Sequence, residues 1–200
     1  QLQHAVNLYE IKPRLTIFAR AITGNSIEIY EAEREGGYRN NNFFLPSKFS
    51  EFKTVNENIS FYLFRILYLS IQKNLGYNWA ETEEYDLLES QQKSKENSAK
   101  VLEELFIQFP ITEKYHQDFL DFFTQNTKKG KEVDTTFIYG KWMRNSPEEE
   151  AGKTLKNFDD KVKKAQEDQP KTILKSNAVE EIISVQIDQK QVEDMVLQHQ

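Results

Sequence analysis

Residues 56–76 read NENISFYLFRILYLSIQKNLG and form the most apolar part of the chain. The stretch begins with polar residues, continues with apolar side chains on almost every face, and ends at Gly76, a residue type that commonly terminates helices. A helix that is apolar all round is a buried helix. We therefore predict a central helix over these residues, with the other elements packed around it.

The chain before this helix predicts one helical region and one hairpin. Apolar residues recur at helical spacing over residues 2–23. Pro13 interrupts this pattern, because proline lacks a backbone donor and clashes with the preceding turn, so we expect two helices or one kinked helix meeting near Lys12. Alternating apolar residues, the pair Gly36-Gly37 and a second apolar stretch predict a β-hairpin near residues 26–46.

The chain after the central helix predicts two more helices. Residues 81–109 have the pattern of one long polar helix that Pro110 ends. Residues 112–125 predict a second helix with Thr112 as its N-cap and an aromatic stripe on one side. An aromatic stripe at this spacing is typical of a core face, although it can also line a ligand site.

Aromatic residues divide the chain into a domain and a connector. Of the 25 Phe, Tyr and Trp residues, 24 lie within residues 1–145, so we place a globular domain there. Residues 146–200 are predicted to be a charged connector with a short strand and a short helix. The predicted class is mainly α-helical with a small β-hairpin, that is, helix-dominated α+β with an extended C-terminal connector. The candidate partner-binding residues are the apolar positions of that strand and helix: Ile183, Val185, Ile187, Val192, Met195 and Val196.

Composition excludes some classes of function. The net charge of −6 argues against general nucleic-acid binding, which needs a basic surface. The longest apolar run, residues 61–71, is shorter than the roughly 20 residues of a transmembrane helix. The sequence has no cysteine, as is typical of a reducing compartment, and we expect a cytoplasmic location.

Motif searches predict no catalytic residue, cofactor or metal site. The three histidines are scattered, and no phosphate-binding glycine loop or serine-hydrolase elbow occurs. Arg65, within the apolar stretch, either grips an anionic ligand or partner, or extends to the surface or pairs with an internal carboxylate. As an alternative to a non-catalytic module, a small ligand-binding or hydrolytic site could be assembled from scattered residues: Arg65, Tyr85, Glu104 and His116.

Four segments carry a resemblance to a known family. The string NFFLPS at 42–47 and residues 58–79 resemble the N-terminal region of the nitric-oxide-reductase activation proteins of the NorD type. Residues 27–38 are similar to the segment that precedes this Leu-Pro motif in the family. Residues 179–199 resemble the acidic connector that leads toward the downstream half of those proteins, which carries a von Willebrand factor A domain.

The resemblance implies a protein that handles partners and is not a free-standing enzyme. Family members are thought to act with a MoxR-type AAA+ ATPase in maturing or activating a target complex such as nitric oxide reductase. Their A-domain holds Mg²⁺ through an Asp-x-Ser-x-Ser string, and no such string occurs in these 200 residues. We therefore expect a docking role for this region, with the ATPase, a target complex and the downstream A-domain as its partners.

Overall fold

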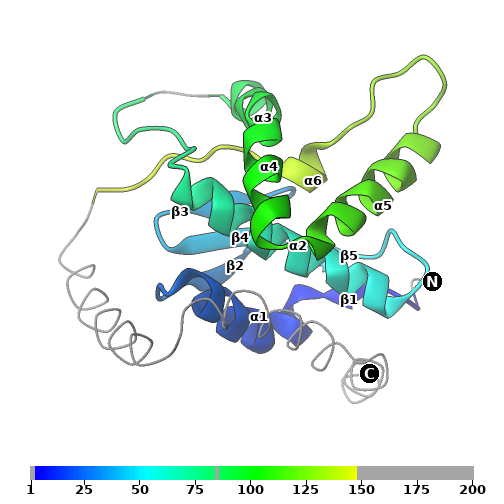
Figure 1. Ribbon diagram of the computed structural model, residues 1–200, viewed down its shortest axis with the longest axis horizontal. Coiled ribbons are helices and arrows are strands. Elements are labelled where there is room, and N and C mark those ends of the chain that lie inside the picture. Colours follow the sequence, from blue (N-terminus) through cyan, green and yellow to red (C-terminus); the bar gives the residue numbers. More distant parts are fainter. Residues whose placement is uncertain (1–2, 84–85, 148–200) are drawn as a thin grey trace.

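The computed structural model describes residues 3–83 and 86–147, and these residues form a helix-dominated α+β fold, as the sequence predicted (Figure 1). In chain order, the elements are β1 (Val6–Asn7), α1 (Leu8–Thr23), β2 (Glu28–Ala32), β3 (Gly37–Arg39), β4 (Asn42–Pro46), β5 (Lys48–Phe49), α2 (Val55–Asn74), α3 (Leu87–Glu96), α4 (Ser98–Gln108), α5 (Ile111–Gln125) and α6 (Thr136–Tyr139). The predicted strand and helix of the connector lie outside the described residues.

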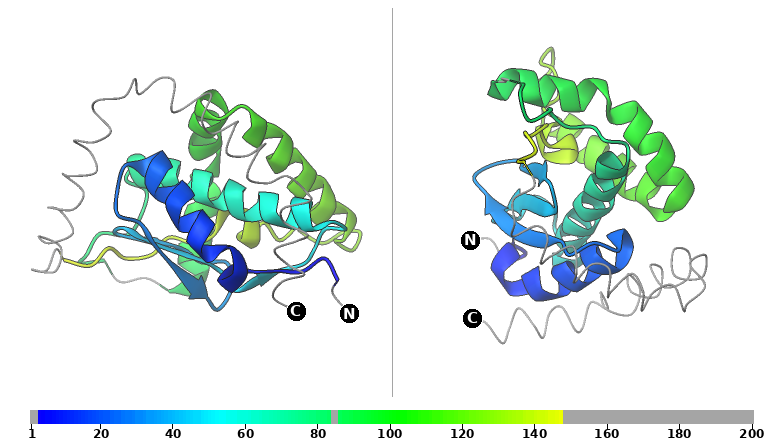
Figure 2. Two further views of the ribbon diagram at one scale, coloured as in Figure 1. Left: turned by 90° about the horizontal axis from the view of Figure 1, so that it is seen from below. Right: turned by 90° about the vertical axis from the view of Figure 1, so that its left-hand side faces the viewer.

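Helix α2 is the centre of the fold, which confirms the prediction for residues 56–76. Its side chains are buried on nearly every face, and α1 packs on one side of it while α4 packs on the other (Figure 2). The helix begins one residue earlier than the polar start suggested. The Thr54 hydroxyl accepts a hydrogen bond from the Glu57 amide (3.1 Å), and this cap satisfies an amide that the first turn leaves open.

Pro13 does not divide the N-terminal helical region. One helix, α1, runs from Leu8 to Thr23 with Pro13 as its sixth residue, while Val6 and Asn7 instead form β1, which pairs with β5. Pro13 lies on the exposed side of α1, where the carbonyl that loses its amide partner can bind water. The opposite side, with Leu15 among its buried residues, packs into the core. Tertiary packing of that face therefore outweighs the local cost of the proline.

The predicted hairpin over residues 26–46 has a different topology from the one expected. The first and last of its three strands along the chain, β2 and β4, pair in parallel. Strand β3 pairs antiparallel with the other side of β4, so β4 is the central strand and the order is β2-β4-β3. The true hairpin is β3–β4, joined through Asn40 at φ +51. Gly36 explains the crossing: a Cβ there would lie 1.9 Å from the Phe44 carbonyl oxygen, so only glycine lets the chain pass this close to β4.

The predicted long helix over residues 81–109 is two helices. Asn97, with φ −98 and ψ 1, separates α3 from α4, and its side chain donates to the Lys93 carbonyl (2.9 Å). This local bond gives the backbone an alternative to continuing the helix. Thr112 is also not the N-cap of α5; it lies inside that helix, and its hydroxyl donates to the Phe109 carbonyl (2.6 Å). The aromatic stripe of α5 packs on the core, with Phe119 1% exposed.

The last described segment, residues 141–146, runs along the outer edge of β3. The Lys141 amide donates to the Gly36 carbonyl (3.0 Å), and the side-chain oxygen of Asn145 accepts from the Asn40 amide (3.1 Å). The Asn78 side chain donates both to the Tyr38 carbonyl (2.9 Å) and to Asn145 (3.0 Å). The Gly36 and Tyr38 carbonyls and the Asn40 amide at that edge are thus paired within the fold.

None of the helices in residues 3–83 and 86–147 has the length and apolar character needed to cross a bilayer.

Candidate functional site

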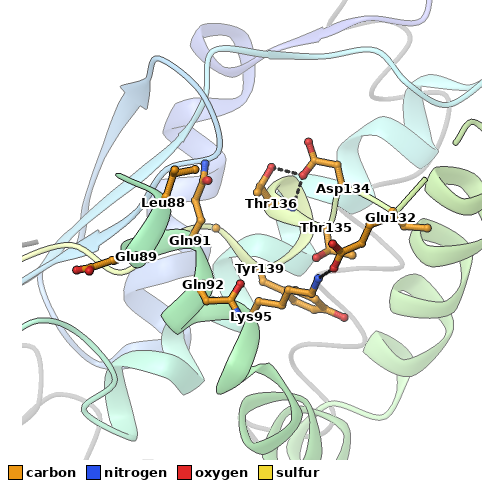
Figure 3. A pocket seen from close by; sticks show the side chains of 12 residues that line it. Leu88, Glu89, Gln91, Gln92, Lys95, Glu132, Asp134, Thr135, Thr136 and Tyr139 are labelled. Atoms are coloured by element: carbon orange, nitrogen blue, oxygen red, sulfur yellow. Dashed lines mark hydrogen bonds and ion pairs between the residues drawn. The ribbon is translucent and has the colours of Figure 1, made fainter. Parts of the chain in front are cut away.

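A pocket of about 580 Å³ lies between α3 and the segment that leads into α6 (Figure 3). Helix α3 is polar after Leu88, and its buried side chains are those of Ser90 and Ser94 in place of large apolar residues. Ser94 donates to the Tyr139 carbonyl (2.8 Å), which ties α3 to Tyr139 and Gly140, the two lining residues that we call the pocket floor. The side chains that line the pocket are those of Leu88, Glu89, Gln91, Gln92, Lys95, Glu132, Val133, Asp134, Thr135, Thr136 and Tyr139, with Gly140 at its base.

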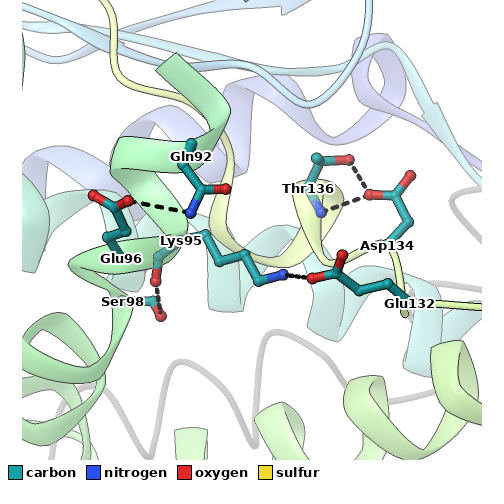
Figure 4. Close-up of polar contacts among 7 residues, drawn as sticks. All are labelled: Gln92, Lys95, Glu96, Ser98, Glu132, Asp134 and Thr136. Atoms are coloured by element: carbon teal, nitrogen blue, oxygen red, sulfur yellow. Dashed lines mark hydrogen bonds and ion pairs between the residues drawn. The ribbon is translucent and has the colours of Figure 1, made fainter. Parts of the chain in front are cut away.

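The charged side chains of the pocket are mostly carboxylates. Lys95 is the pocket's single cation, and its ammonium forms an ion pair with Glu132 of the segment that leads into α6 (Figure 4). The hydrogen bond from Lys95 and its positive charge lower the pKa of the Glu132 carboxyl. Glu89 and Asp134 add two further negative charges, so the pocket as a whole is acidic. Such a lining favours a cationic or hydrogen-bond-donating group.

The Asp134 carboxylate shapes the pocket wall. It accepts hydrogen bonds from the amide (3.0 Å) and the hydroxyl (2.8 Å) of Thr136, which fixes the turn into α6 (Figure 4). The Thr136 hydroxyl is therefore part of a turn. In the acyl-transfer triads the nucleophile is instead activated by a histidine or another base within hydrogen-bond reach, and that histidine is oriented by a further carboxylate. The pocket lining contains no histidine.

Two buried charged side chains, Glu35 and Arg65, lie behind the pocket floor. Glu35, which is 0% exposed, accepts a hydrogen bond from Gln91 of the pocket wall (3.0 Å) and forms an ion pair with Arg34 (3.5 Å). Arg65, also 0% exposed, donates to the Ile138 carbonyl (2.9 Å) and lies 5.2 Å from the Tyr68 ring centroid. A Cβ at Gly140 would lie 2.3 Å from the Arg65 guanidinium, so the floor rests directly on it.

Burial and neighbouring charges set the protonation of Arg65. Loss of solvation lowers its pKa to about 10, and the attraction of Tyr68 and Glu35 opposes that shift. The guanidinium therefore remains charged at neutral pH. The sequence allows three roles for Arg65: a ligand or partner contact, a surface position, or an interaction with an internal carboxylate. The structure fits the third, because Arg65 is enclosed by the fold, donates to the Ile138 carbonyl and is attracted by the Glu35 carboxylate.

Of the described residues of the alternative site, Arg65 and His116 belong to one buried cluster, and Glu104 makes its hydrogen bond elsewhere. Arg65 and His116 are connected through two tyrosines. The Arg65 guanidinium lies 5.2 Å from the Tyr68 ring centroid, and the ring centroids of Tyr68 and Tyr139 are 5.9 Å apart. The Tyr139 hydroxyl is in turn 2.9 Å from Nε2 of His116. This cluster is buried, and burial lowers the pKa of His116. Glu104 instead accepts from Gln108 of its own helix (2.7 Å).

Two sets of sequence-predicted residues lie outside the described part of the chain. Tyr85, the fourth residue of the alternative site, is one. The others are the six candidate partner-binding residues of the connector: Ile183, Val185, Ile187, Val192, Met195 and Val196. Within residues 3–83 and 86–147, no group of three or more metal-ligating side chains comes together.

Sequence reasoning missed the pocket. Its ion pair joins Lys95 and Glu132, which are 37 positions apart on elements that share no recognisable motif. Comparison with protein-family models, with curated proteins and with solved structures finds no match for this chain.

Proposed function

We propose that this chain is a non-catalytic protein-interaction module. The observation that carries the proposal is the pocket rim: Leu88 is 76% exposed beside the acidic lining formed by Glu89, Glu132 and Asp134. An exposed apolar side chain next to carboxylates suits a partner segment that has an apolar residue followed by a basic one. The polar lining supports recognition more than catalysis, because the Lys95 and Asp134 side chains are already engaged with their neighbours.

The resemblance to NorD-type proteins supplies the partners. We propose that the module works in the cytoplasm with a MoxR-type AAA+ ATPase in the maturation or activation of a target enzyme complex such as nitric oxide reductase. The downstream A-domain of the same kind of protein is a further partner. The connector residues Ile183, Val185, Ile187, Val192, Met195 and Val196 are proposed as additional contacts.

A pull-down of residues 1–200 against the AAA+ ATPase of the same organism, with and without ATP, tests the proposal. We expect retention of the ATPase, a loss of retention when residues 179–200 are deleted, and a reduction of about tenfold or more with Leu88→Glu. Ile107→Glu is the matched control, because Ile107 is 69% exposed on α4 and does not line the pocket. Absence of retention in both nucleotide states would contradict docking by this region.

A second candidate is small-ligand binding in the same pocket. Its volume of about 580 Å³ falls within the range of about 300–1,000 Å³ that is usual for ligand sites. The acidic lining favours a small cationic amine, and 1,4-diaminobutane is a suitable probe. Binding would shift the amide resonances of α3 and residues 132–140 and would weaken in Glu132→Gln. A spectrum that the diamine leaves unchanged would remove this candidate.

A further inference from the structure

Helix α1 presents a row of apolar side chains away from the core. Tyr9 is 79% exposed and Ile17 is 67% exposed, and Pro13 and Ala21 are exposed at the same four-residue spacing. Residues four apart lie on one face of a helix, so these four form a continuous strip along α1, which we call the outer row. The opposite face, where Leu15 is 3% exposed, packs into the core.

Basic side chains flank the outer row. Arg14 is exposed on α1, Lys12 lies with its ammonium 5.6 Å from the Tyr30 ring, and Arg20 pairs with Glu28 (2.7 Å). Glu10 is the single acidic residue of α1, and Glu28 already offsets Arg20, so Lys12 and Arg14 are the cations of α1 that form none of the ion pairs seen in the described residues. An occupant of the outer row should therefore be apolar along one side and acidic beside it.

The C-terminal sequence has this pattern. Val192, Met195, Val196 and His199 recur at helical spacing, and Glu193 and Asp194 lie between them. Residues 179–200 contain five acidic residues and one lysine. We propose that residues 192–199 of the same chain pack against the outer row of α1 and cover it.

The chain is long enough for this contact. The 44 residues from 148 to 191 span up to about 140 Å when extended. A domain of about 145 residues has a radius of gyration of only about 15 Å. Residue 192 can therefore reach any face of the domain. A tether of this kind also keeps the segment at an effective concentration well above that of a separate molecule.

The contact would have a regulatory consequence. Val192, Met195 and Val196 also belong to the proposed partner-binding residues, so a partner that binds them must compete with α1. This contact goes beyond the proposed docking function. It can be tested without the ATPase, so a failure here is separate from a failure of that function.

Engineered disulfides provide the test, because the native sequence contains no cysteine. In the full chain, Ile17→Cys combined with Val196→Cys would report the contact under a mild oxidant. Ile107→Cys combined with Val196→Cys is the matched control, because Ile107 is exposed to a similar degree on another helix. We expect the 17–196 pair to form an intramolecular disulfide about tenfold faster than the control pair.

Charge reversal separates specific packing from chance collision. Arg14→Glu in the 17–196 background should slow the cross-link several-fold, and adding Glu193→Arg should restore it. Equal rates for the 17–196 and 107–196 pairs would overturn the proposal. Cross-linking only between two molecules would also overturn it, because the outer row would then bind a second copy of the chain.

Discussion

Replacing Arg65 by methionine tests whether the buried charges under the pocket floor act together. The pKa of about 10 is a net value: about 3 kcal/mol of weaker proton binding than in water remains after the attractions of Tyr68 and Glu35 have opposed the desolvation. Removing the guanidinium relieves that net cost, but it also removes a charged hydrogen bond to the Ile138 carbonyl of about 2 kcal/mol. The net change at position 65 itself is therefore small. The larger effect is on Glu35, which loses the attraction of Arg65 and keeps its ion pair with Arg34 (3.5 Å).

The lost attraction on the buried Glu35 carboxylate sets the expected magnitude. Leaving a buried charge with no partner destabilises a fold by about 3 kcal/mol or more, but Glu35 keeps Arg34 (3.5 Å) and Gln91 (3.0 Å), so Arg65→Met should lower the free energy of unfolding by about 2 kcal/mol. The melting temperature should fall by about 4–8 °C. Adding Glu35→Gln should recover about 1 kcal/mol, because the amide can still bond to Gln91 without carrying a charge.

Urea unfolding followed by tryptophan fluorescence measures these changes. The ring centroids of Trp79 and Trp142 lie 5.5 Å apart in the described fold, so the fluorescence of these residues reports on its packing. Lys114→Met is the matched control, because it removes one positive charge from an exposed position on α5 and should change stability by less than about 0.5 kcal/mol. A double variant no more stable than Arg65→Met alone would refute the coupling between Arg65 and Glu35.

Three further predictions concern backbone and pH. Gly140→Ala should lower the free energy of unfolding in urea by about 2 kcal/mol or more, because φ is +69 and the added methyl group would clash with Arg65. Gly130→Ala is the control: its φ is +85 but the site is open, so it should cost about 1 kcal/mol. Because burial lowers the pKa of His116, stability should fall as pH drops below about 6.5, and His116→Phe should flatten that dependence in unfolding midpoints measured from pH 7 to 5; an unchanged slope would contradict it. Burial raises the pKa of several tyrosines, so stability should fall as pH rises past about 10, where the unfolded chain releases protons that the fold retains. Near-ultraviolet absorbance should then show these tyrosines ionising only on unfolding; they are Tyr38, Tyr62, Tyr68, Tyr115 and Tyr139.

The helices were the most predictable part of the fold because their signals are local. The continuous apolar pattern of α2 identified the centre of the core before any packing was known. The break at Asn97 was missed because the residue has a polar pattern that is compatible with helix on both sides. Around Pro13 the sequence predicts either two helices or one kinked helix. It cannot decide between them, because the packing that holds α1 together involves residues far away in the sequence.

The sheet and the pocket were less predictable because both depend on distant contacts. Alternation in β2 and β4 indicated strands but carried no information on whether they pair parallel or antiparallel. The pocket needs α3 to lie beside residues 132–140, and the Lys95–Glu132 pair has no local signature. Arg65 was singled out correctly as unusual, whereas its acceptor, the Ile138 carbonyl, is a backbone atom that no side-chain pattern identifies.

The segment over residues 141–146 has a consequence for how the chain can be shortened. It bonds to the backbone on either side of β3, at Gly36 and Asn40, and it holds Asn78, whose side chain donates to the Tyr38 carbonyl of β3. A chain cut after Gly140 would keep all six helices and five strands of the described fold but would lose these contacts, which favours pairing of that edge with another chain. The shortest version expected to remain monodisperse therefore ends no earlier than Ser146, whose amide still bonds to Asn40 (2.8 Å).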